Sequence, residues 1–283
     1  MKILKKIPFL TLAMAVLITV MMVTPTGVSG ATAPVNLATA STFGVLANTT
    51  ITNTGTSSVG GSAGGDIGLY AGSSITGLST LTISGTVHKS DAVAMTAKAD
   101  LSAAYDNAAG RTPFTTIESE LGGKTLVPGV YTSTAGNFGL TGTLTLDGQN
   151  DANAVFIFQM TKTLITASAS KIVMINGARV CNVFWQVGSS ATLGTNSYFI
   201  GHILASTSVS ANTGAAVYGS LHAKTGAVTL QSNKIMNIVC TSTPTVEGGI
   251  LPSTGSDIYG LLMLGAFLVL VGVVGLRFRK RYE

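Results

Sequence analysis

The sequence predicts a mainly β protein in which short strands coil into a β-solenoid accompanied by one long α-helix. The exported part of the chain is rich in Gly, Ala, Ser, Thr, Val and Ile and poor in aromatic residues, which suits strands and tight turns. Short apolar and Thr/Ser-rich segments recur in its second half. One stretch, residues 87–110, has the periodicity of a helix instead.

Residues 35–86 are expected to form short strands broken by glycine and polar turns. The stretches FGVLANTTITNTG and SVGGSAGGDIGL show this pattern.

The helix is predicted at about residues 90–110. Ser90 or Asp91 can cap its start, Gly110 can close it, and Pro113 stands beyond. Apolar residues recur at the three- and four-residue spacing of an amphipathic helix. These residues are Ala94, Ala97, Leu101, Ala104, Tyr105 and Ala108.

A loose repeat follows the helix. Four apolar segments (154–159, 182–187, 199–205 and 217–223) are each followed by a Thr/Ser/Ala/Gly-rich strand (163–170, 190–197, 206–214 and 225–233). Gly201 and Gly219 are 18 residues apart, which suits one solenoid coil. Successive coils would stack at roughly 4.8 Å. A β-sandwich is the alternative. The single tryptophan, Trp185, is expected in the core.

The N-terminal segment has the pattern of a secretory signal. Lys2, Lys5 and Lys6 precede an apolar run over residues 7–23, and small residues follow. We expect residues 1–30 to be a signal peptide cleaved near Gly30 or Ala31. A retained membrane anchor is the alternative.

The motifs of the C-terminal segment follow one another in the order typical of a cell-surface anchor. After a linker (241–250) come LPSTG (251–255), an uncharged apolar run long enough for a transmembrane helix (258–276) and a basic tail (277–283). Basic residues stay in the cytoplasm, which places the preceding domain outside. A single-span membrane protein is the alternative.

This order resembles the sorting signal of sortase-anchored proteins of Gram-positive bacteria. The resemblance implies sortase and peptidoglycan as partners, a cut between Thr254 and Gly255, and a membrane-spanning precursor of a secreted, wall-anchored protein. The matching residues are Leu251, Pro252, Thr254 and Gly255.

The net charge of +5 comes from the two ends of the chain. Residues 31–254 carry nine basic and nine acidic residues, so this part is neutral. Nucleic acid is excluded as a partner, because its binding needs a basic surface.

Two cysteines, Cys181 and Cys240, are present. An oxidising compartment favours a disulfide between them. Two separately buried thiols are the alternative.

No enzymatic or metal site is expected, and no cofactor. His88, His202 and His222 lie in different segments without neighbouring ligand residues, so structural or surface roles are favoured. The Gly-rich stretch at 60–65 lacks the Lys-Ser/Thr of a phosphate loop, and no G-x-S-x-G elbow is present.

Several blocks of residues 34–237 resemble, in order, the microbial ice-binding (antifreeze) proteins. They include VNLATASTFGVLANTTITNTG, GGKTLVPGVYTS, LTGTLTLDGQNDANAVFIFQM, CNVFWQVGSSATLGTNSYFIGHILA and GAVTLQSNKI. The resemblance implies a right-handed, discontinuous β-solenoid of triangular cross-section over residues 31–240, with the helix along one side. It also implies ice as the partner, bound through one flat solenoid face.

The Thr/Ser-rich strands suit such a face. Small side chains keep it flat, and their methyl and hydroxyl groups can hold ordered water, whereas charges would orient water differently. Each contact is weak, so the face must be broad and preorganised. On one register of these strands the outward residues are Thr163, Thr166, Ser168, Thr192, Thr195, Ser208, Ser210, Asn212, Ala227, Thr229 and Gln231; a one-residue slip would reverse every choice.

An ice-binding protein displayed on the cell wall could limit ice growth or recrystallisation, or hold the cell at ice. The alternative is an adhesin that binds a glycan or protein through the same solenoid. An adhesin would need an exposed pocket, for which Tyr70, Tyr198 and Tyr218 are candidates.

Overall fold

The computed structural model describes residues 32–240 of the 283-residue chain. The predicted signal peptide (1–30), linker (241–250), LPSTG motif (251–255), transmembrane helix (258–276) and basic tail (277–283) lie outside the described residues. Within residues 32–240, no helix is both long and apolar enough to cross a membrane.

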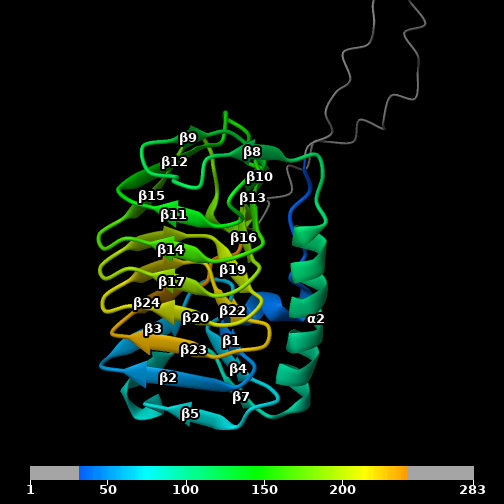
Figure 1. The fold of residues 1–283 in the computed structure, drawn as a ribbon. Helices are drawn as coiled ribbons and strands as arrows, with labels where there is room; N and C mark the ends of the chain where they lie inside the picture. The colour runs from blue at the N-terminus through cyan, green and yellow to red at the C-terminus, as the bar shows by residue number, and fades with distance from the viewer. Residues whose placement is uncertain (1–31, 241–283) are drawn as a thin grey trace, which may run out of the picture. The chain divides into compact units, whose positions relative to one another are not determined.

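Three sheets of parallel strands enclose a common core, in a mainly β, solenoid-like fold. Figure 1 shows the strands of successive coils stacked one above another, with the helix α2 beside them. The β-sandwich alternative is wrong, because sandwich sheets are antiparallel.

Sheet A is the sheet beside α2 (Figure 1). Its strands, in spatial order, are β7 (Val87–Lys89), β4 (Asp66–Leu69), β1 (Phe43–Ala47), β22 (Leu221–Ala223), β19 (His202–Ala205), β16 (Val183–Val187), β13 (Phe156–Met160), β10 (Gly129–Ser133) and β8 (Thr115–Ile117).

Sheets B and C complete the coils. Sheet B contains β11 (Phe138–Leu140), β14 (Leu164–Thr166), β17 (Ala191–Leu193), β20 (Val209–Ala211), β23 (Val228–Gln231), β2 (Thr50–Thr54) and β5 (Ser74–Thr76). Sheet C contains β6 (Leu81–Ile83), β3 (Ser57–Gly60), β24 (Lys234–Met236), β21 (Ala216–Tyr218), β18 (Tyr198–Ile200), β15 (Lys171–Ile175), β12 (Thr143–Asp147) and β9 (Thr125–Leu126). The 3-10 turns are η1 (Ala38–Thr42), η2 (Leu78–Thr80) and η3 (Val180–Asn182).

The coils are not stacked in sequence order. The first coil, β1–β3, pairs with the last, β22–β24. β7 and β8, which flank α2 in the sequence, lie at opposite edges of the nine-stranded sheet A. The helix therefore returns the chain along the stack. Its 18 residues rise roughly 27 Å, most of the roughly 38 Å that nine strands span.

The helix α2 (Ala92–Ala109) confirms the predicted element and its start. Asp91 is the N-cap, and its Oδ1 accepts a hydrogen bond from the Ala94 amide at 2.8 Å. Gly110 follows the last helical residue. The predicted apolar residues are buried except Tyr105, which is half-buried. They pack on outward side chains of sheet A, including Leu46, Phe184 and Leu204.

A lysine of the helix is hydrogen-bonded to the backbone at the end of a sheet A strand. Lys98 is buried, and its Nζ donates hydrogen bonds to the carbonyl oxygens of Ala223 and Lys224, at 2.5 and 2.7 Å. Burial, together with the charge of Lys224, lowers the pKa of Lys98 to about 8.

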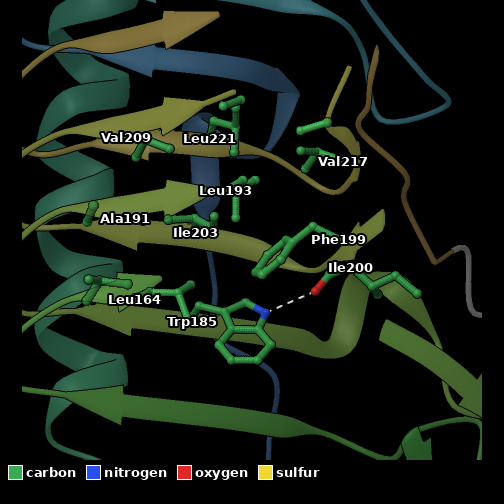
Figure 2. Close-up of a cluster of buried hydrophobic side chains, with 14 of the residues drawn as sticks. Leu164, Trp185, Ala191, Leu193, Phe199, Ile200, Ile203, Val209, Val217 and Leu221 are labelled. Atoms are coloured by element: carbon green, nitrogen blue, oxygen red, sulfur yellow. Dashed lines mark hydrogen bonds between the residues drawn. The ribbon is translucent and has the colours of Figure 1, made fainter. Parts of the chain in front are cut away.

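The interior of the coils is apolar and closely packed. Trp185 is fully buried, as predicted; its ring stacks on Phe158 at a centroid distance of 3.9 Å. Its Nε1 donates to the Ile200 carbonyl at 2.9 Å, so the one polar atom of the indole is paired (Figure 2). Leu164, Leu193 and Val209 enter the same core from sheet B (Figure 2). These core contacts fix the strands of sheet B from their inner side.

Two predicted apolar segments, 199–205 and 217–223, are each divided between two sheets. Gly201 separates β18 from β19, and Gly219 separates β21 from β22. Both glycines have positive φ, 112° and 143°, so the chain turns from sheet C into sheet A there. A Cβ on Gly219 would also collide with the carbonyl oxygen of Gly201. A coil therefore has three strands, one more than the two-segment repeat suggested.

Cys181 and Cys240 form a disulfide, as the oxidising compartment favoured. Their Cα atoms are 5.7 Å apart, and the loop between them spans 59 residues. The bond ties the end of the domain to η3, ahead of β16.

Replacing both cysteines, Cys181→Ser with Cys240→Ser, should lower the free energy of unfolding by about 2–4 kcal/mol, because a bridge across a long loop restricts the unfolded chain. Denaturant unfolding of the oxidised wild type and the double variant measures the difference. Reduction of the wild type should reproduce it. Equal midpoints for all three samples would contradict the prediction.

Candidate functional site

The outer surface of sheet B carries a ladder of hydroxyl groups. Side chains alternate along each strand, so the middle residue of a short strand faces outward when its neighbours enter the core. The pairing places the middle residues in one row across the sheet. In spatial order the row is Gly139, Ile165, Thr192, Ser210, Thr229, Thr52 and Thr76. The last five all carry hydroxyl groups.

Two further rows flank this ladder, because residues two positions away share the same face. The preceding row is Asn137, Thr163, Ser190, Ser208, Ala227, Thr50 and Ser74. The following row is Thr141, Ala167, Gly194, Asn212, Gln231 and Thr54. It ends there because β5 stops at Thr76, and Gly77, with φ 72°, turns the chain into η2. None of the residues in the three rows is charged. We call this three-row surface the sheet B face.

Buried amides brace the edge of the sheet B face. Asn233 is buried in the turn after β23, and its Nδ2 donates to the carbonyl oxygens of Asn212 at 2.8 Å and Ala215 at 3.1 Å. Asn53, also buried, donates to the carbonyl of Gly55 at 2.9 Å and to the Thr80 hydroxyl at 3.0 Å. The bonds to Thr80 and Asn212 join neighbouring coils, and together the four bonds hold the turns that follow β2, β5, β20 and β23 in register.

Most of the predicted face residues lie on the sheet B face. Their side chains are neither buried nor charged, and they lie on or beside four of its strands, β14, β17, β20 and β23. They are Thr163, Thr192, Ser208, Ser210, Asn212, Ala227, Thr229 and Gln231. Ser168 and Thr195 are accessible but lie in the turns that follow β14 and β17.

The outward orientation predicted for Thr166 is wrong. Its side chain is 3% exposed, and its Oγ1 accepts a hydrogen bond from the Gly194 amide at 2.9 Å. Strand alternation gives the reason. Thr163 and Thr166 are three positions apart and cannot both face outward from one regular strand. Ile165 takes the outward position and is 56% exposed.

The sequence prediction missed the contribution of the N-terminal coil. Thr50, Thr52 and Thr54 on β2, with Ser74 and Thr76 on β5, extend the face by two strands beyond β23. The alternation in TITNT (residues 50–54) was a local signal for an outward threonine row. Its place beside β23 depends on a pairing across more than 170 residues.

The other two sheets present different surfaces. The helix α2 covers part of sheet A. Sheet C carries Lys171 and Lys234 in one row with Tyr198, and Tyr198 lies against Tyr218 with ring centroids 4.8 Å apart. Unlike the sheet B face, this surface is charged. Two of the three candidate tyrosines, the exposed Tyr198 and the half-buried Tyr218, thus form a pair on sheet C.

Charge begins at the β11 end of the sheet B face. Glu120 forms a bridge with Gly139, one step beyond β11. Its Oε1 accepts hydrogen bonds from the amides of Gly122 and Thr141, both at 2.8 Å. The carboxylate therefore lies outside the three rows but borders them.

The histidines hold structural positions. His202 Nδ1 lies 2.9 Å from the Ser220 hydroxyl, and His222 Nε2 lies 2.9 Å from the Phe43 carbonyl oxygen. Both rings are fully buried, which lowers the pKa of His202 to about 3 and that of His222 to about 4. His88 Nδ1 pairs with Asp91 Oδ2 at 2.8 Å. Among residues 32–240, no three His, Cys, Asp or Glu side chains gather as metal ligands would.

Comparisons of the whole sequence point to one family. The model of the family described as Ice-binding-like matches residues 45–236. An ice-binding protein of Nostoc sp. (strain HG1) is 44% identical over 249 residues, covering 87% of this chain and 87% of that protein. An ice-binding protein of Flavobacterium frigoris is 36% identical and covers 71% of this chain and 75% of that protein.

Solved structures agree with the sequence comparisons. An ice-binding protein from the Antarctic ascomycete Antarctomyces psychrotrophicus has a TM-score of 0.68 at 40% identity, covering 72% of this chain and 98% of that chain. An ice-binding protein from an Antarctic biological consortium has a TM-score of 0.70 at 37% identity, covering 74% of this chain and 92% of that chain. Both solved chains consist almost wholly of the matched region. Residues 32–240 are therefore expected to fold without the rest of the chain.

Proposed function

Because this chain belongs to the Ice-binding-like family, we propose that it adsorbs to ice through the sheet B face. The observation that carries this proposal is the register of sheet B, which aligns five hydroxyl side chains on neighbouring strands within a surface free of charge. No bond is made or broken in adsorption, so the proposal is not an enzymatic one.

The geometry suits a repetitive, rigid ligand. Parallel strands repeat at about 4.8 Å in one direction, and outward residues repeat at about 6.6 Å along each strand, which gives a regular two-dimensional array. Threonine adds a stiff side chain with one methyl and one hydroxyl group. A buried core and ladder hydrogen bonds hold the array before ice arrives, so little ordering entropy is lost on contact.

The residues we assign to ice contact come from both halves of the chain. From the sequence prediction we retain Thr192, Ser208, Ser210, Asn212, Ala227, Thr229 and Gln231; Thr163 lies beside β14, next to the exposed Ile165, and is not assigned to the contact. We add Ser190 from the row that precedes the ladder, and Thr50, Thr52, Thr54, Ser74 and Thr76 from the N-terminal coil. Thr195, after β17, would lie at the edge of the contact, and Ser168, after β14, would lie outside it.

We also propose that the protein is secreted and held at the cell wall, and that the solenoid is right-handed with a triangular cross-section. The wall proposal rests on the order of signal sequence, LPSTG motif, apolar segment and basic tail. Sortase would cut between Thr254 and Gly255 and join Thr254 to peptidoglycan, after a stage as a membrane-spanning precursor. The adhesin alternative gains no support, since the matched relatives are named for ice binding.

Ice growth tests the proposal directly. The oxidised domain, residues 32–240, is expected to shape ice crystals into facets and to open a gap between the melting and freezing points. Adsorption at many weak contacts on a preorganised face is the reason. A nanolitre osmometer measures both effects. Unshaped ice with a domain that circular dichroism shows to be folded would overturn the proposal.

A further inference from the structure

Ile165 interrupts the hydroxyl ladder of the sheet B face. In the middle row its neighbours are Gly139 on β11 and Thr192 on β17. From Thr192 onward, every middle-row residue to Thr76 carries a hydroxyl group. Beyond Ile165 the row has no side chain at all, because its last member is glycine.

The side chain of Ile165 also breaks the flatness of the surface. It is 56% exposed, whereas Thr192, Ser210, Thr229 and Thr52 are half-buried. Isoleucine carries one more non-hydrogen atom than valine or threonine, the Cδ1 carbon at the end of one branch. On a flat row this atom projects above the threonine groups, and next to Gly139 the surface drops by a whole side chain.

A crystal plane cannot adapt to such a step. A protein partner can repack side chains around a projection, but a rigid lattice needs many weak contacts at one height. The β11 end is further limited by the Glu120 carboxylate, which borders Gly139. The flat, hydroxylated and uncharged part of sheet B therefore ends at β17.

We infer that Ile165 limits the ice-contact area of this protein, confining it to the five strands β17, β20, β23, β2 and β5. This inference rests on the proposed function. In this role Ile165 determines how far the contact extends, and it does so by preventing contact rather than by making one. The residue sets the height at which ice would lie on β14 and thereby excludes β14 and β11 from the contact.

Two substitutions distinguish the effect of the height of the side chain at position 165 from the effect of its missing hydroxyl group. Ile165→Val and Ile165→Thr both remove the projecting carbon, and valine and threonine have the same branched shape. Because height is the limiting property, both variants are expected to raise thermal hysteresis at equal protein concentration by about 1.5-fold or more. The position faces solvent and makes no core contact, so both variants should keep the unfolding midpoint of the wild type.

Val173→Thr is the matched control. Val173 is an exposed β-branched residue on β15 of sheet C, with 41% of its surface accessible. This control should leave thermal hysteresis unchanged. An unchanged or lower value for both Ile165 variants, in a domain whose wild type shapes ice, would overturn the inference. A rise with threonine alone would overturn it too, since the missing hydroxyl would then be the limit. Absence of ice shaping by the wild type would instead reject the proposed function itself.

Discussion

Thr229→Tyr is expected to reduce thermal hysteresis by about tenfold or more, while the domain stays folded. Thr229 lies in the middle of the hydroxyl ladder, paired with Ser210 on one side and Thr52 on the other. A tyrosine ring would stand well above the neighbouring hydroxyl and methyl groups. A rigid ice plane would then touch the ring and lose most of its contacts on either side.

Thr145→Tyr supplies the matched control. Thr145 is the half-buried middle residue of β12 on sheet C, with the same side chain and the same relation to its strand. This variant should keep the wild-type hysteresis. Loss of activity in Thr145→Tyr with activity kept in Thr229→Tyr would place the ice contact on sheet C and contradict our assignment. Equal unfolding midpoints would show that neither ring disturbs the core.

Acid is expected to destabilise the domain strongly between pH 6.5 and 4, through His202 and His222. Their pKa values in the folded protein are about 3 and about 4, against about 6.5 in an unfolded chain. The unfolded chain therefore binds protons that the folded chain excludes. Stability is full above pH 6.5 and falls as the pH drops towards the folded values. At pH 4.5 the two residues together should cost about 5 kcal/mol.

The environment of the pair explains the size of the effect. Both rings are fully buried in sheet A, and each lies near another positive or titrating group, His202 near His222 and His222 near Lys98. A charged imidazole there would lack water and face like charge. The neutral rings instead make one hydrogen bond each, His202 Nδ1 with the Ser220 hydroxyl and His222 Nε2 with the Phe43 carbonyl.

Urea unfolding between pH 7.5 and 4.5 measures this dependence. His202→Gln and His222→Gln should each remove about half of the pH dependence, whatever their effect on stability at pH 7.5. An imidazole signal of His202 or His222 that titrates near pH 6.5 in the folded protein would contradict the prediction.

Local patterns in the sequence account for much of the fold. The spacing of Ala94, Ala97, Leu101 and Ala108 defined the helix, and Asp91 and Gly110 defined its ends. Alternation and glycine spacing defined short strands in coils. These features follow from the 3.6-residue and 2-residue periods of the backbone, which neighbouring residues express without help from distant ones. The same patterns identified β17, β20 and β23 as strands of a polar face.

Features that depend on register could be decided only by tertiary structure. Thr166 and Ile165 exchange places if β14 shifts by one residue, and only the core contact of Leu164 settles which of them faces outward. The splitting of two apolar segments at Gly201 and Gly219 reflects the close approach of neighbouring coils. The pairing of Cys181 with Cys240 likewise depends on where the chain end returns.

Sequence reasoning missed the strands that the N-terminal coil adds to the sheet B face. They join the face because the coils are not stacked in sequence order. β2 joins β23 across most of the domain, and this adds Thr50, Thr52 and Thr54 to a surface begun more than a hundred residues later. Periodicity describes each strand but not its neighbours. Which strands become neighbours is decided by the shared core and by the helix that returns the chain from one edge of the stack to the other, and both exist only in the folded protein.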